Sequence, residues 1–187
     1  MKRFLLFLSF LLGIVFLLII VVSITGNRSS SDNVISANKV FDVADYADRN
    51  SEVKTIVAGP IVGNDEYREV RISVTPNSRT IDIIQGYQGK VIKTQSFANN
   101  REAYTEFLDA LSDQKFGISR DTKLSLSGSC ATGKRYVYQT FDNSEIVSDV
   151  WSGSCTRGSS QGSTIQIQNL FRRQITDYYK FTAGLNL

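Results

Sequence analysis

The chain has 187 residues, of which 42% are hydrophobic and 21% are charged, proportions typical of a folded globular protein rather than a disordered one. Histidine is absent and cysteine occurs only twice, which excludes Ser-His-Asp and Cys-His catalysis and zinc sites built on histidine or on four cysteines of one chain. Lys2 and Arg3 supply two of the three excess positive charges. The remainder is nearly neutral, so there is no electrostatic reason to expect a nucleic-acid partner.

The first predicted element is a transmembrane helix at residues Phe4 to Val22. Of these 19 residues, 17 are Leu, Ile, Val or Phe, and none is charged. At ~1.5 Å per residue the run nearly spans a hydrocarbon core of ~30 Å. It is longer than the ~7–15 apolar residues of a secretory signal, so we expect an uncleaved signal anchor in the lipid bilayer. A cleaved signal that releases a secreted domain is the alternative.

Flanking charge predicts how the chain crosses the membrane. Lys2 and Arg3 precede the apolar run, and the positive-inside rule then places the N-terminus in the cytoplasm and the remainder outside. We therefore expect a single-pass protein of the cell membrane with three parts: a signal-anchor helix at 1–26, a polar tether at 27–38, and an extracytoplasmic domain at 39–187. About 150 residues suffice for one domain.

The first half of that domain is predicted to contain a short helix and an antiparallel meander. Apolar residues at helical spacing indicate the helix near residues 40–47. Strands follow where β-branched residues alternate with polar ones, and glycine, proline and asparagine mark the turns between them. These strands are expected near residues 53–61, 70–75, 80–83 and 91–97.

The second half is predicted to contain two helices and a further pair of strands. Asn99 and Glu102 form a capping-box pattern at the start of a helix that ends near Gly117. A β unit spans residues 124–151 and turns at 142–144, and an apolar stripe from Ile167 to Tyr179 indicates the last helix. The fold class is therefore α+β, with an antiparallel sheet of about six or seven strands packed against two main helices.

Cys130 and Cys155 are predicted to form a disulfide. Their midpoint falls in the expected turn, so they should face each other across the two strands, where Cα atoms of opposed residues lie ~4.5–5.5 Å apart. The space outside the cytoplasm supplies the oxidising conditions. Each cysteine follows a Ser-Gly-Ser sequence, and these small residues favour a structural role in which they allow close approach of the backbones.

The same repeat suggests a ligand surface as the alternative. Ser127 and Gly128 precede the first cysteine, and Ser152 and Gly153 precede the second. Trp151 lies beside the second copy, where its ring could stack on a sugar or a partner, or belong to the core instead.

Only weak catalytic patterns remain. Ser51 and Lys54 form the one S-x-x-K sequence, in which the serine would be the nucleophile and a desolvated lysine the base. Residues 128–134 have the spacing of a phosphate-binding loop, but Arg135 stands where a Ser or Thr should bind magnesium. We expect no metal site and no cofactor.

The sequence thus predicts a membrane-anchored, extracytoplasmic binding or assembly module of the cell envelope rather than an enzyme. An envelope protein or a glycan is the expected partner, and nucleic acid is not. An envelope hydrolase that uses Ser-Lys or carboxylate chemistry is the alternative function, and the released domain is a third.

Overall fold

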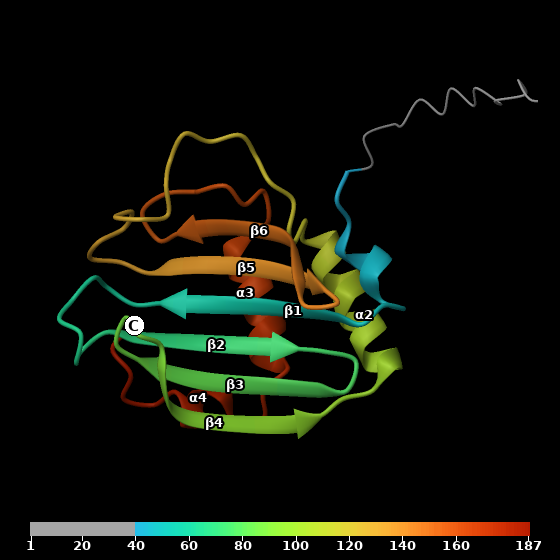
Figure 1. Ribbon diagram of the computed structural model, residues 1–187, viewed down its shortest axis with the longest axis horizontal. Coiled ribbons are helices and arrows are strands. Elements are labelled where there is room, and N and C mark those ends of the chain that lie inside the picture. Colours follow the sequence, from blue (N-terminus) through green and yellow to red (C-terminus); the bar gives the residue numbers. More distant parts are fainter. Residues whose placement is uncertain (1–39) are drawn as a thin grey trace, which may run out of the picture. The chain divides into compact units, whose positions relative to one another are not determined.

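Six antiparallel strands form one sheet in the order β4-β3-β2-β1-β5-β6 (Figure 1). The computed structural model describes residues 40–187, so the predicted anchor and tether lie outside the described residues. Within 40–187 no helix is long and apolar enough to cross a bilayer. The strands are β1 (Ser51–Ala58), β2 (Arg68–Val74), β3 (Ser78–Gln85), β4 (Lys90–Ala98), β5 (Arg135–Asp142) and β6 (Glu145–Gly153).

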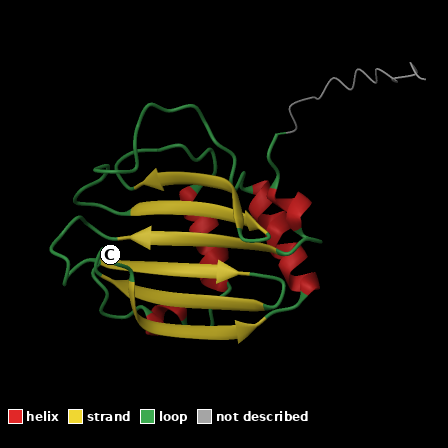
Figure 2. Cartoon of the chain, in the orientation of Figure 1, coloured by secondary structure: helices red, strands yellow, loops and turns green. Residues whose placement is uncertain are grey.

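Helices cover one face of this sheet (Figures 1 and 2). The two main ones are α2 (Arg101–Asp113) and α3 (Thr164–Arg173), and the short elements are η1 (Val43–Tyr46) and α4 (Tyr178–Phe181). Phe107 of α2 meets Phe171 of α3 edge to face, with the ring centroids 5.2 Å apart. The prediction of an α+β domain with a six- or seven-stranded antiparallel sheet and two main helices is confirmed.

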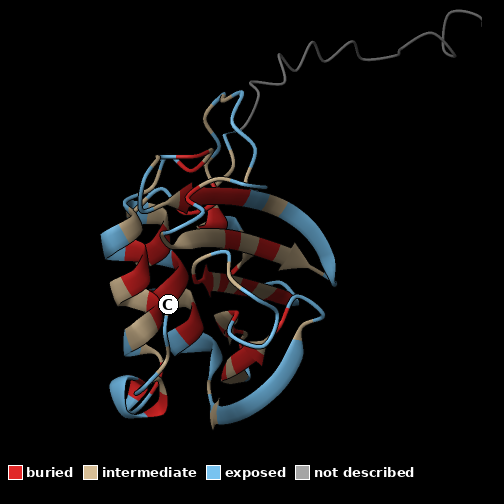
Figure 3. Cartoon of the chain, turned by 90° about the vertical axis from the view of Figure 1, so that its left-hand side faces the viewer, coloured by how far each residue is buried: buried red, intermediate tan, exposed pale blue. Residues whose placement is uncertain are grey.

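The alternation along β1 shows why the sheet has two different faces. Val53 and Val57 are buried in the core, whereas Lys54 and Ile56 between them are half-buried. Because side chains of a strand point alternately to opposite faces, the first pair faces the helices and the second faces away. Figure 3 shows the buried residues gathered between the sheet and the helices. The other face, which we call the open face, has no helix over it.

The two edges of the sheet differ. All residues of β4 except Phe97 are exposed, so this strand presents its outer backbone to solvent. At the opposite edge, the end of β6 is paired by the segment that follows it. The Trp151 amide donates to Ser159 Oγ at 3.0 Å, and the Ser160 amide donates to the Trp151 carbonyl at 2.9 Å. That segment therefore lies close beside the disulfide.

The boundaries of the helices differ from those expected. The N-cap of α2 is Asn100, whose side chain accepts from the Ala103 amide at 2.8 Å, rather than Asn99. The last helix is divided, because Asp177 adopts a left-handed conformation with φ of 56° between α3 and α4. The apolar stripe therefore extends over two helices. Most of it is buried in the core as expected, including Phe171, Ile175 and Tyr178, but Tyr179 is 75% exposed.

Candidate functional site

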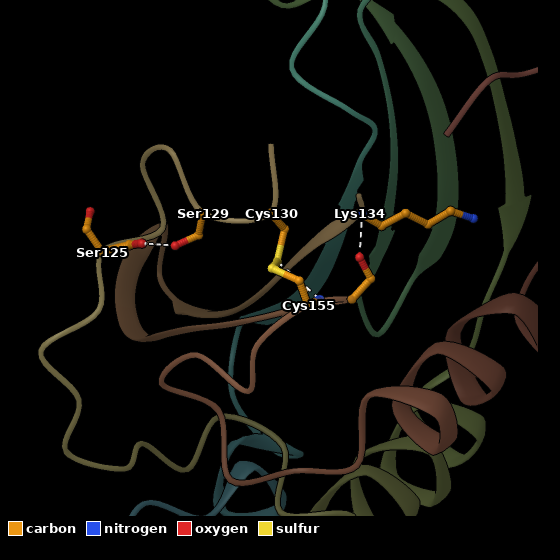
Figure 4. The surroundings of a disulfide bond; sticks show 6 residues. Ser125, Ser129, Cys130, Lys134 and Cys155 are labelled. Atoms are coloured by element: carbon orange, nitrogen blue, oxygen red, sulfur yellow. Dashed lines mark hydrogen bonds between the residues drawn. A yellow bond between two sulfur atoms is a disulfide. The ribbon is translucent and has the colours of Figure 1, made fainter. Parts of the chain in front are cut away.

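Cys130 and Cys155 form the predicted disulfide, with their Cα atoms 5.5 Å apart (Figure 4). The sequence suggested that they oppose each other within the two strands of the hairpin, but they do not. The last opposed pair of the hairpin is Arg135 and Gly153, so both cysteines lie beyond the strand ends. The bond therefore joins two loops, which we call the 119–134 loop and the 154–163 loop.

The 119–134 loop is held at several points. Ser119 forms an isolated β-bridge with Ser160, and the Ala131 carbonyl accepts from the Ile61 amide at 2.7 Å. Near the disulfide, the Lys134 amide donates to Ser154 Oγ at 3.0 Å (Figure 4). The disulfide and these hydrogen bonds fix the backbone, so the loop can form the wall of a site.

A cleft of about 650 Å³ lies between the two loops and the start of α3. Arg120 comes from one loop and Arg157 from the other, and neither forms an ion pair within residues 40–187. Arg120 is oriented by a hydrogen bond of 2.8 Å from its Nε to the Ser160 carbonyl. We call this the arginine cleft. Its remaining lining residues carry no charge, and they are Gly153, Ser154, Cys155, Thr156, Ser160, Gln161, Gly162, Ser163, Thr164 and Ile165.

The electrostatics of the arginine cleft favour an anion. Two arginines line it and no carboxylate does. The first turn of α3 adds backbone N–H groups that have no acceptor inside the helix, together with the positive end of the helix dipole. The Ser163 side chain caps the helix by accepting from the Gln166 amide at a long 3.5 Å. Charge-assisted hydrogen bonds from such donors are what phosphate and carboxylate groups require.

Two hydrogen bonds tie α3 to the sheet next to the cleft. The Ser152 and Thr164 hydroxyls are 2.7 Å apart, and Gln168 donates to Thr55 Oγ1 at 2.8 Å. Tyr138 is fully buried beside them, and this burial raises the pKa of its hydroxyl while Ser152, Gln168 and Thr164 act in the opposite direction. The contact between Ser152 and Thr164 holds the start of α3 against β6, and Thr164 and Ile165 of that first turn line the cleft.

A second hollow, of about 300 Å³, lies on the open face. Ala58 and Tyr67 are buried at its floor beside the half-buried Ile56 and Val137, and Leu126 of the 119–134 loop forms one wall. We call it the sheet-face groove. Its polar residues are Glu69, Arg71, Arg135, Gln139 and Asp149.

One carboxylate of the groove is fully engaged. Glu69 accepts from the Tyr67 hydroxyl at 2.7 Å and from Arg71 Nη2 at 2.7 Å. Burial and the hydrogen bond to Glu69 raise the pKa of Tyr67, so its hydroxyl stays protonated and remains a donor. Arg135 and Asp149 also line the groove, but unlike Glu69 neither of them forms an ion pair in the described part of the chain.

The residues predicted as a ligand surface are divided by the structure. Trp151 is 8% exposed, and Ser152 is 3% exposed with its hydroxyl on Thr164. Gly158 packs so closely on the Trp151 indole that a Cβ there would lie 2.7 Å from the ring. Gly153 lines the arginine cleft, whereas Ser127 and Gly128 are exposed in the 119–134 loop.

Ser51 and Lys54 are not brought together. Ser51 is buried on the helix side, where its hydroxyl donates to the Tyr46 carbonyl at 2.7 Å and lies 2.9 Å from the Tyr104 hydroxyl. Lys54 lies on the open face and pairs with Glu52 at 3.0 Å. Residues three apart on a strand point to opposite faces, so this lysine cannot take a proton from this serine.

Sequence reasoning missed Arg120, Arg157 and the sheet-face groove. The only signal for the cleft was a pair of arginines flanking serine- and glycine-rich loops before a helix. The two arginines come together through the bridge between Ser119 and Ser160, which is a tertiary contact that no local sequence pattern predicts.

Among residues 40–187 no group of three His, Cys, Asp or Glu side chains could hold a metal ion.

No protein-family model matches the chain, and no curated protein is detectably similar to it.

Proposed function

We propose that this protein is a membrane-tethered, extracytoplasmic binding module of the cell envelope that takes an anionic group in the arginine cleft. The observation that carries the proposal is the pair Arg120 and Arg157, which line one cleft without carboxylate partners in the described domain. The ligand class is a phosphate- or carboxylate-bearing envelope polymer, because such groups match guanidinium donors.

Placement outside the cytoplasm rests on separate support. Phe4 to Val22 has the length and composition of a membrane span, and a disulfide within the folded domain fits an oxidising compartment. Alkaline carbonate extraction of cell membranes tests the anchor: the protein should stay in the pellet and be released only by detergent.

Binding by the full chain in detergent micelles tests the ligand class. We would titrate polyphosphate and polyglutamate, with neutral dextran as the reference polymer. Both anions should bind, and the affinity should fall as salt rises because the contacts are ionic. The double variant Arg120→Gln/Arg157→Gln should weaken binding by at least tenfold, which corresponds to about 1.4 kcal/mol.

The matched control is the double variant Arg173→Gln/Lys180→Gln. Arg173 is exposed in the last turn of α3 and Lys180 is exposed in α4, and neither lines the cleft, so their removal changes the net charge by the same two units without touching the site. Equal losses in the control and in the cleft variant would mean that only net charge matters, and the assignment to the cleft would be wrong. A preference for one polymer over the other would distinguish phosphate from carboxylate as the natural group.

A further inference from the structure

The sheet-face groove is a second hollow that the anion-binding proposal does not use. It lies on the open face, across β1, β2, β5 and β6, and no helix of the described domain covers that face. Ala58 and Tyr67 at its floor are 6% and 4% exposed, and Ile56 and Val137 are half-buried. An aliphatic side chain of a ligand that packs on this floor would favour binding, because apolar surface is removed from water.

The groove has a wall as well as a floor. Leu126 reaches it from the 119–134 loop, although the loop's neighbouring Leu124 does not line it and is 53% exposed. The Ser129 hydroxyl donates to the Ser125 carbonyl across the turn that contains Leu126 (Figure 4). The disulfide at Cys130 then fixes the end of that turn. Leu126 is therefore held at the groove rather than free to move away.

Two charges of opposite sign lie at the two ends of the groove. Arg135 is opposite Ala58 and Gly153, near the loop end of the sheet, and Asp149 is opposite Gln139 on β5. Residues 135 and 139 are four apart, which is about 13 Å along a strand. The Arg135 side chain donates to the Gly59 carbonyl at 2.8 Å, and its Nε is buried without a hydrogen-bond partner in the described domain.

The spacing of these features matches an extended peptide. Side chains on one face of an extended segment recur every second residue, so positions i and i+4 are also about 13 Å apart. We propose that the sheet-face groove binds an extended peptide segment of a partner protein, with an acidic residue toward Arg135, an aliphatic residue over Ile56 and Val137, and a basic residue toward Asp149. The three positions are i, i+2 and i+4, so one residue lies between each charge and the apolar position.

Synthetic nine-residue peptides test this inference on the full chain in detergent micelles, by fluorescence anisotropy of a label at the peptide terminus. The probe SQESLSKQS carries Glu, Leu and Lys at positions i, i+2 and i+4. It should bind at least fivefold more tightly than SQESLSEQS and SQKSLSKQS, which place like charges at both ends, and more tightly than SQESGSKQS, which lacks the leucine.

Variants of the protein locate the binding. Leu126→Asp should weaken SQESLSKQS at least tenfold, whereas Leu124→Asp, in the same loop but outside the groove, should not. Asp149→Lys should reverse the preference in favour of SQESLSEQS, and Asp109→Lys, on the exposed side of α2, should leave it unchanged. Arg120→Gln/Arg157→Gln should leave peptide binding unchanged, so failure of the cleft proposal and failure of this one are distinguishable.

Two results would overturn the inference. One is equal affinity for all four peptides, or no binding by any of them at 1 mM. The other is binding of SQESLSKQS that survives Leu126→Asp while circular dichroism shows that the variant is folded.

Discussion

Tyr104 shows how one buried residue makes stability depend on pH. It is fully buried, with its hydroxyl 2.9 Å from Ser51 Oγ. Burial raises the pKa of Tyr104 to about 12, and the hydrogen bond to Ser51 acts in the opposite direction. An unfolded tyrosine ionises near pH 10. Between pH 10 and 12 the unfolded state therefore loses a proton that the folded state keeps, and the free energy of unfolding falls as pH rises.

We expect Tyr104→Phe to remove this part of the alkaline sensitivity. Between pH 8 and pH 11 the variant should lose about 1.4 kcal/mol less stability than the wild type. Burial raises the pKa of Tyr67 and Tyr138 as well, so some sensitivity should remain. Urea unfolding followed by Trp151 fluorescence measures it, with the exposed Tyr179→Phe as the control. If the free energy of unfolding fell equally with pH in the wild type and in Tyr104→Phe, the role assigned to the burial of Tyr104 would be contradicted.

The strands were the elements that the sequence predicted best, because several of them carry their own alternation of apolar and polar residues. In β2 and β3 the apolar residues at every second position are the ones that face the helices. The turn at Asn143 and Ser144 was also predicted, and both residues have positive φ values, of 48° and 72°. Such signals are local, so a single sequence contains them.

The elements that the sequence predicted incorrectly depend on contacts between residues that are distant in the sequence. Leu124 and Leu126 alternate with polar residues as a strand would, but the sheet offers them no partner and the segment is a loop. The last helix was predicted as one element because its apolar spacing continues past Asp177. The left-handed conformation of that residue divides it, and no glycine marks the break.

At the scale of elements, the disulfide joins the 119–134 loop to the 154–163 loop; both loops line the arginine cleft, and the first also supplies Leu126 to the sheet-face groove. It closes a loop of 25 residues, for which the chain-entropy treatment gives about 3.5 kcal/mol of stabilisation. The double variant Cys130→Ser/Cys155→Ser should therefore unfold with a free energy lower by about that amount. A reductant should destabilise the wild type similarly and leave the double variant unchanged. A loss below about 1 kcal/mol would show that the loops are held mainly by their hydrogen bonds.

At the scale of the whole molecule, the two faces of the sheet differ in what covers them. Helices bury the apolar side of the sheet, and what remains is an open face with the sheet-face groove and an end with the arginine cleft. Sequence predicted the disulfide that lies between the hollows. It did not predict the hollows, because Leu126, Arg120 and Arg157 acquire their roles only when the 119–134 and 154–163 loops are folded together.

The disulfide also reports on which side of the membrane the domain lies. We expect a membrane-impermeant maleimide to label Cys130 and Cys155 in intact cells only after reduction, since an extracytoplasmic domain keeps them paired. A positive control replaces both by serine and adds Asp109→Cys on the exposed side of α2, which should be labelled without reduction. Labelling of this control only in permeabilised cells would place the domain in the cytoplasm. Envelope polymers would then be the wrong ligands for the arginine cleft, and the proposed function would fall with the topology.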